Sequence, residues 1–154
     1  MAMLMARENV WLLELRFCPT LHTLEGLTEA AAVDAVVEGL ELARKRILIT
    51  KPFFAAGVIL CALRSYPDDH GVRMAELAAK KLAPRVSALP NNSLPAIGVV
   101  GWDIAGDEGS FPLANHKAGL LRAQVGRLSR NRRVMDAHMC PLAGVRRACD
   151  GACW

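Results

Sequence analysis

The sequence predicts an α/β fold built on a parallel sheet. Three short apolar runs, at residues 10–16, 57–64 and 98–104, lack strict alternation of polar and apolar residues. That pattern is typical of strands covered on both faces. Helical patterns of ten or more residues separate the runs, so the order indicates βαβ units. Three units fit about three-eighths of a (β/α)8 barrel or one half of a doubly wound sheet.

The first predicted helix has clear boundaries at both ends. Thr28 can cap a helix that begins at Glu29, whose carboxylate suits the first turn. The basic residues 44–46 favour the last turn, where cations stabilise the helix dipole. One apolar stripe at i, i+3, i+4 and i+7 consists of Val33, Val36, Val37 and Leu40.

Two further helices are predicted. The second follows Asp68 and Asp69 and is limited by Pro84. Its expected inward-facing residues are Met74, Leu77, Ala78 and Leu82. The third covers about residues 114–125, with Leu120, Leu121 and Ala123 apolar. Residues 87–96 carry two prolines and two asparagines and are expected to form a loop.

Charge divides the chain into two parts. Residues 126–154 hold six arginines and two aspartates, which equals the whole formal net charge of +4. We therefore expect a domain at residues 1–125 and a basic, Cys- and Arg-rich, irregular tail at residues 126–154. The neutral main part argues against a nucleic-acid-binding surface. No apolar run is long enough for a membrane span or a signal peptide, so a cytoplasmic protein is expected.

Polar or unusual residues follow each predicted strand. The first strand leads into ELRFCP, the second into CALRS and the third into IAGDE. In parallel α/β folds, ligands bind where the carboxyl ends of the strands converge. Polar groups at these positions therefore indicate a candidate site.

The same residues resemble an internal part of the adenosine deaminases. The second barrel unit of that family is similar to LLELRFCPTLHTLEGLT with AVDAVVEGL. The third unit is similar to GVILCALRS with ELA, and the fourth is similar to GVVGWDIAGDEGSFPLANH. The similarity covers about residues 8–125. It implies a partial (β/α)8 TIM barrel of about three βα units, and hydrolytic deamination of adenosine to inosine as the parent reaction.

The resemblance implies roles for four residues. Gly106 matches the glycine whose backbone N–H faces the purine ring, and Leu63 matches a position lining the apolar part of the nucleoside pocket. Arg16 and Arg64 match arginines that we interpret as structural, paired with carboxylates near the barrel mouth. We expect residues 107–108 to be ordinary loop charges rather than site residues, whereas Leu63 can equally be ordinary core.

The resemblance also implies a zinc ion, whose ligands are absent from this sequence. The family holds zinc with a His-x-His pair and with histidines after the fifth and sixth strands. Neither His-x-His nor His-Ala-Gly-Glu occurs here. We expect His22 and His116 to be structural and His70 to lie on a solvated loop. No catalytic or metal residue is assigned, and we expect the chain to be inactive alone.

The cysteines and the tail admit further interpretations. Cys18 and Cys61 lie among apolar residues and are expected to be buried free thiols. His138 with the tail cysteines matches no common zinc spacing. The tail arginines could bind an anionic surface. We favour an off-frame or alternatively spliced end.

Two rival functions remain open. One is a non-catalytic interaction or regulatory fragment, which would self-associate or bind partners through open sheet edges. The other is a fragment of an AMP or adenine deaminase. Residues that recognise phosphate or ribose would distinguish AMP and adenine from adenosine as the substrate.

Overall fold

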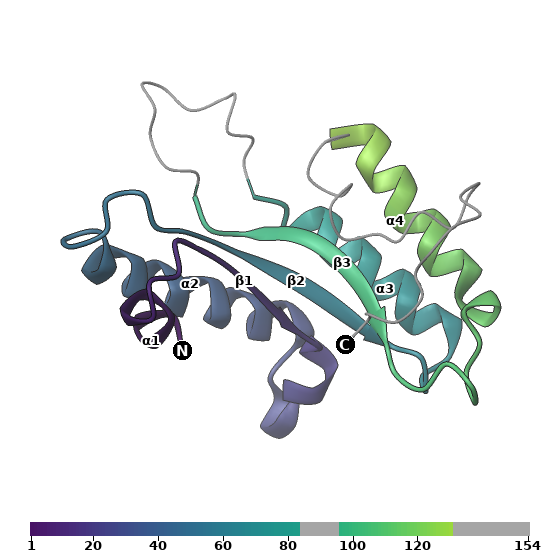
Figure 1. The fold of residues 1–154 in the computed structure, drawn as a ribbon. Helices are drawn as coiled ribbons and strands as arrows, with labels where there is room; N and C mark the ends of the chain where they lie inside the picture. The colour runs from purple at the N-terminus through teal and green to yellow at the C-terminus, as the bar shows by residue number, and fades with distance from the viewer. Residues whose placement is uncertain (84–95, 131–154) are drawn as a thin grey trace.

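The chain folds around a three-stranded parallel sheet. The computed structural model describes residues 1–83 and 96–130, and the strands lie in the order β1-β2-β3. These strands are β1 at Leu12–Phe17, β2 at Ala55–Leu63 and β3 at Val99–Ala105 (Figure 1). The predicted parallel α/β fold is confirmed. This strand order occurs both in barrels and in one half of a doubly wound sheet, so assignment to a barrel stays a prediction.

The register of the sheet places the carboxyl ends of the three strands at the same end of the sheet. Phe17 at the end of β1 pairs with Leu60, and Leu63 at the end of β2 pairs with Ala105 at the end of β3. β1 therefore stops three residues before β2 does. The register between β2 and β3 shifts by one residue after Val58, because Val58 pairs with Val99 and Ile59 pairs with Gly101.

In the part of the chain that the structure describes, four helices accompany the sheet. α1 covers Ala2–Arg7, and α2, at Glu29–Ile47, joins β1 to β2. α3, at Asp68–Lys80, joins β2 to β3, and α4, at Lys117–Arg130, follows β3. Short 3-10 turns lie at Pro19–His22 (η1), Leu24–Gly26 (η2) and Leu113–His116 (η4). No helix in residues 1–83 and 96–130 has both the length and the apolar character needed to cross a membrane.

The predicted features of α2 are confirmed. The Thr28 hydroxyl oxygen accepts a hydrogen bond from the backbone N–H of Ala31 at 3.1 Å, which caps the helix. Val33 and Leu40 are buried, while the two valines between them are half-buried against the core. The apolar stripe is therefore the face that packs on the sheet.

The prediction for α3 was correct in its centre and wrong at its end. Met74 and Ala78 are fully buried, as expected. Leu82, however, lies beyond the helix and forms a parallel bridge with Val99. The backbone leaves the helix after Lys80 because the neighbouring peptide groups bond β3 instead: the Lys81 carbonyl accepts from the Val99 N–H at 3.0 Å.

The boundary of the third predicted helix needs correction. α4 continues to Arg130, so residues 126–130, which we expected to be irregular tail, are helical. Ala123 is buried, whereas Leu121 is half exposed and faces away from the core. The remainder of the tail, with His138, and nearly all of the loop predicted at residues 87–96 lie outside the described residues.

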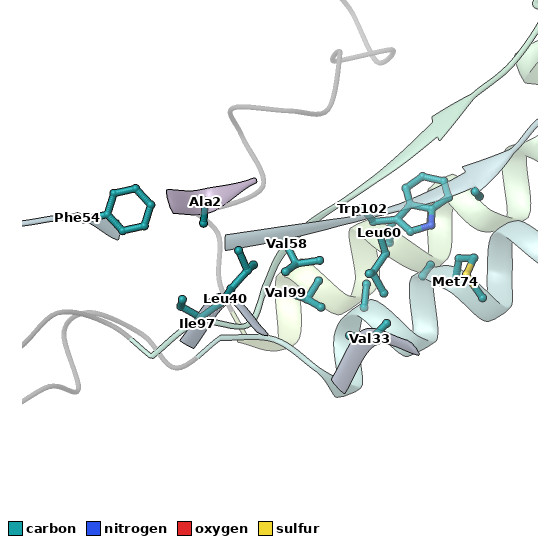
Figure 2. Packing of buried hydrophobic residues seen from close by; sticks show 14 of the residues in the cluster. Ala2, Val33, Leu40, Phe54, Val58, Leu60, Met74, Ile97, Val99 and Trp102 are labelled. Atoms are coloured by element: carbon teal, nitrogen blue, oxygen red, sulfur yellow. The ribbon is translucent and has the colours of Figure 1, made fainter. Parts of the chain in front are cut away.

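The core lies between the sheet and the helices. Leu60 and Trp102 pair across β2 and β3, and both belong to one buried cluster with Val33 of α2 and Met74 of α3 (Figure 2). Phe54, at the start of β2, is also fully buried and packs with Ala2 of α1 in the same cluster. The helices thus cover one face of the sheet and supply most of its apolar contacts.

α3 and α4 approach each other closely at two glycines. A Cβ atom on Gly119 would lie 3.0 Å from the carbonyl carbon of Gly71 and 3.2 Å from its Cα. Such distances leave no room for a side chain. The crossing point of these helices therefore depends on glycine at residue 119.

His70 corrects another prediction. We expected it on a solvated loop, but it lies in the first turn of α3 and is 2% exposed. Its Nε2 lies 2.8 Å from the Thr20 hydroxyl, which donates its proton to Glu29 Oε1 at 2.6 Å. The hydroxyl must therefore accept from Nε2–H, which fixes the neutral tautomer of the imidazole. The cluster ties η1 to α2 and α3.

Burial is the main reason that the pKa of His70 is lowered from its ordinary value of 6.5, and the nearby Arg73 guanidinium lowers it further. Glu29, Asp69 and His116 also face the ring, and the two carboxylates act in the opposite direction. Nδ1 is buried without a hydrogen-bond partner among the described residues. A proton added there would have no acceptor.

We expect Gly119→Ala to lower the free energy of unfolding by roughly 1–3 kcal/mol, because the new methyl group separates α3 from α4. Gly39→Ala is the matched control. Gly39 lies within α2, and a Cβ there meets nothing within 4 Å. This control should stabilise the chain by roughly 0.5–1 kcal/mol. Urea denaturation monitored by circular dichroism measures both, and equal effects would contradict the packing argument.

Acid should destabilise the chain through His70. The folded-state pKa lies below 6.5, so between that pKa and pH 6.5 the unfolded chain binds more protons. The free energy of unfolding should therefore be highest above pH 6.5 and fall below it, by at most about 1.4 kcal/mol per pH unit. His70→Gln keeps an amide donor near Thr20 and should flatten this slope. An unchanged slope in urea titrations at pH 7.5 and 5.5 would show that another group causes it.

Candidate functional site

The candidate site lies at the carboxyl ends of the parallel strands. Leu63 and Ala105 are paired there, and the Arg64 backbone N–H donates to the Ala105 carbonyl at 2.8 Å. Gly106 follows directly. The two residues that the sequence assigned to substrate binding, Leu63 and Gly106, are therefore neighbours at the ends of adjacent strands.

Gly106 has a backbone conformation that other residues rarely adopt. Its φ is +127°, and it is exposed. A Cβ atom at this position would lie 3.3 Å from Cβ and 3.4 Å from the backbone nitrogen of Arg64. Both the dihedral angle and the contact therefore favour glycine. The backbone at Gly106 is consequently accessible to a flat ligand.

Leu63 is half-buried, in contrast to the fully buried residues that precede it in β2. Its pairing with Ala105, a small residue, leaves part of the leucine side chain uncovered at the sheet edge. A partly exposed leucine at this position is suited to contact an apolar ligand surface.

Asp107 shapes the turn after Gly106. Its carboxylate accepts hydrogen bonds from the backbone N–H groups of Gly109 at 3.0 Å and Ser110 at 3.2 Å. The backbone N–H of Phe111 donates to the Asp107 carbonyl at 3.1 Å. A side-chain hydrogen bond from Ser110, and then these backbone bonds, lower the pKa of Asp107. Asp107 therefore builds the loop, the plainer of its two sequence interpretations.

Both predicted structural arginines pair with carboxylates. Arg16 of β1 reaches across β2 to Asp103 of β3. Arg64 lies 3.3 Å from Glu108 Oε1, and its side chain is only 10% exposed. Sequence reasoning did not foresee a second contact of Arg64, from Nη1 to the Phe111 carbonyl at 3.4 Å. A backbone acceptor leaves no sequence signal.

Cys18 and Cys61 are buried free thiols, as predicted. Burial, and then the carboxylate of Asp103, raise the pKa of Cys61 to about 11. The thiol is therefore protonated at neutral pH, and this excludes Cys61 as a thiolate nucleophile there.

The histidines differ in their surroundings. His116 in η4 is buried, as expected of a structural residue, but its Nδ1 has no hydrogen-bond partner within the described ranges. His22 is exposed, and its ring contacts the edge of Phe17 at a centroid distance of 5.7 Å. The sequence missed the cluster around His70, although His70, Met74 and Ala78 continue one helical stripe at spacings of four.

Three curated proteins illustrate what the chain is similar to. An adenosine deaminase of Lactococcus lactis is 34% identical over 107 residues, which make up 70% of this chain and 25% of that protein. Adenosine deaminase 1 of Streptomyces coelicolor is 34% identical over 112 residues, with shares of 73% and 24%. The adenosine deaminase of Clostridium kluyveri is 27% identical over 118 residues, with shares of 77% and 29%.

No family model and no solved structure matches the chain. The matched relatives nevertheless agree in name, and each aligns with about 70% or more of this chain. The matched stretch is about a quarter as long as each of those proteins. This chain is therefore similar to the adenosine deaminases over about 70% of its own length and spans only about a quarter of the length of the relatives that it matches.

Proposed function

We propose that this chain forms one side of a purine-nucleoside pocket and is not sufficient for deamination. The parent reaction is hydrolysis of adenosine to inosine in a zinc-dependent (β/α) barrel. In this proposal the Gly106 N–H faces the purine ring, and the Leu63 side chain contacts the apolar part of the nucleoside. The chain itself supplies recognition without a reacting group.

One observation carries the proposal: an exposed, left-handed glycine follows β3 directly beside a half-buried leucine that ends β2. A backbone N–H without a covering side chain can approach a flat ring closely. An apolar side chain beside a backbone donor is the usual composition of a small-molecule site. The relatives are named adenosine deaminases, and we therefore propose adenosine as the ligand.

The zinc ion implied by the family does not fit the described residues. Within residues 1–83 and 96–130, no group of three or more His, Cys, Asp or Glu side chains could hold a metal ion. We therefore assign no reaction step to this part of the chain.

We expect adenosine to bind weakly and to remain unconverted. In NMR titrations, adenosine should shift the Gly106 amide signal and the Leu63 methyl signals, while ultraviolet absorbance shows no inosine. Gly106→Ala should weaken binding by about tenfold or more, because alanine is strained at φ +127°. Gly109→Ala is the control in the same turn, since its Cβ would make only an ordinary contact, 3.4 Å from Asp107 Oδ1. Turnover, or equal shifts throughout the chain, would contradict the proposal.

The open edge of β1 should cause self-association. No described strand pairs with the outer side of β1, whereas the start of β3 is partly covered by the bridge with Leu82. Size-exclusion chromatography should show dimers or larger species that increase with concentration. Leu12→Lys, at an exposed residue of β1, should shift the chain toward monomer, and Leu42→Lys, at an exposed residue of α2, should not. A concentration-independent monomer would disprove edge pairing.

A further inference from the structure

We propose that Arg64 is a positioning residue that holds the turn at residues 106–111 so that the Gly106 N–H points outward. This inference rests on the proposed nucleoside pocket and assigns a specific role to a residue that was predicted only to be structural. Arg64 does not touch the ligand in this proposal. It acts through the backbone of the turn.

The contacts of Arg64 reach both ends of the turn. Its backbone N–H donates to the Ala105 carbonyl at 2.8 Å, immediately before Gly106. Its Nη1 donates to the Phe111 carbonyl at 3.4 Å, where the turn ends. One residue of β2 therefore fixes the exit of β3 and the return of the chain five residues later.

The contact between Arg64 and the Phe111 carbonyl lies at the end of the turn, where the chain continues into η4. Phe111 precedes Pro112, which has no N–H, and η4 begins at the next residue. The Phe111 carbonyl thus lies at the point where the chain enters η4 and α4. The Arg64 side chain, which follows β2 directly, therefore ties the turn to the sheet. This contact adds to the hydrogen bonds that the turn makes within itself.

Burial indicates which contact of Arg64 matters most. The arginine side chain is 10% exposed, whereas Glu108 is 72% exposed. An ion pair with so exposed a carboxylate is screened by water and contributes little. A largely buried guanidinium instead needs its acceptors nearby. Both contacts leave Nη1, and the contact with the Phe111 carbonyl is the one that acts on the backbone of the turn.

Arg64 also forms the surface beneath Gly106. Its Cβ and backbone nitrogen lie 3.3 and 3.4 Å from the position where a Gly106 Cβ would be. The glycine backbone is consequently pressed against β2 on one side and continued by the Asp107 turn on the other. Gly106 itself remains exposed despite these contacts.

The test compares Arg64→Met with Arg64→Lys in the full chain. Methionine keeps the apolar stem and removes the donors, and lysine keeps the charge. The matched control is Arg16→Met, which removes another paired arginine from β1 without contact to the turn. Amide hydrogen exchange and the Gly106 amide NMR signal are measured without ligand and then with adenosine.

Arg64→Met should speed exchange at the Gly109, Ser110 and Phe111 amides by about tenfold and shift the Gly106 signal, while amides within β2 keep their protection. Arg64→Lys should restore most of the Gly106 signal, and Glu108→Gln should change little. Arg16→Met should leave the turn unaltered. Unchanged exchange in Arg64→Met, or the same loss in Arg16→Met, would overturn the positioning role.

The response of the chain to adenosine distinguishes a failure of this inference from a failure of the proposed function. If the unaltered chain responds to adenosine and Arg64→Met loses that response, both stand. If the unaltered chain does not respond, the purine pocket is wrong. The exchange rates alone then decide whether Arg64 holds the turn.

Discussion

The packing of one sheet face against α2 and α3 is the constraint on which the rest of the structure depends. Leu60 and Trp102 lie side by side on β2 and β3 and are covered by Val33 and Met74. Burial of such apolar surface is the main favourable term in folding. Because this face fixes β2 and β3 in register, it also fixes which residues stand at the ends of the strands.

Register links the core to the candidate site. Leu63 and Ala105 end their strands as partners because the pairing of Ile59 with Gly101, directly after the register shift, sets the alignment from there to the ends of the strands. The bulge between Val58 and Ile59 belongs to that alignment. A slip by one residue would exchange the two faces of a strand and bury the wrong side chains. The position of Gly106 beside Arg64 is thus a consequence of core packing.

Polar residues connect the loops at this edge to the helices. Thr20 of η1 joins Glu29 of α2 and His70 of α3, and Arg64 joins β2 to the turn after β3. Each link uses a buried or largely buried group with a defined partner, which makes its loss costly. The loops are therefore held by side chains from neighbouring units, as expected of loops that must present a fixed surface.

The sequence by itself determined the local elements. Apolar runs defined the strands to within two residues, and Thr28 with the stripe from Val33 to Leu40 defined α2. These features depend on near neighbours in the chain, which the sequence displays directly. The ELRFCP, CALRS and IAGDE motifs likewise indicated the family before any coordinates.

Only the tertiary structure decided the contacts between distant residues. His70 is buried because Thr20 and Glu29 meet it from other elements, and Leu82 leaves its helix because β3 offers backbone partners. The contact of Arg64 with Phe111 ends on a carbonyl, which every residue carries. The hydrogen bond between Thr20 and His70 joins residues 50 positions apart, and the contacts at Leu82 and from Arg64 end on backbone groups, so no local pattern of side chains could reveal them.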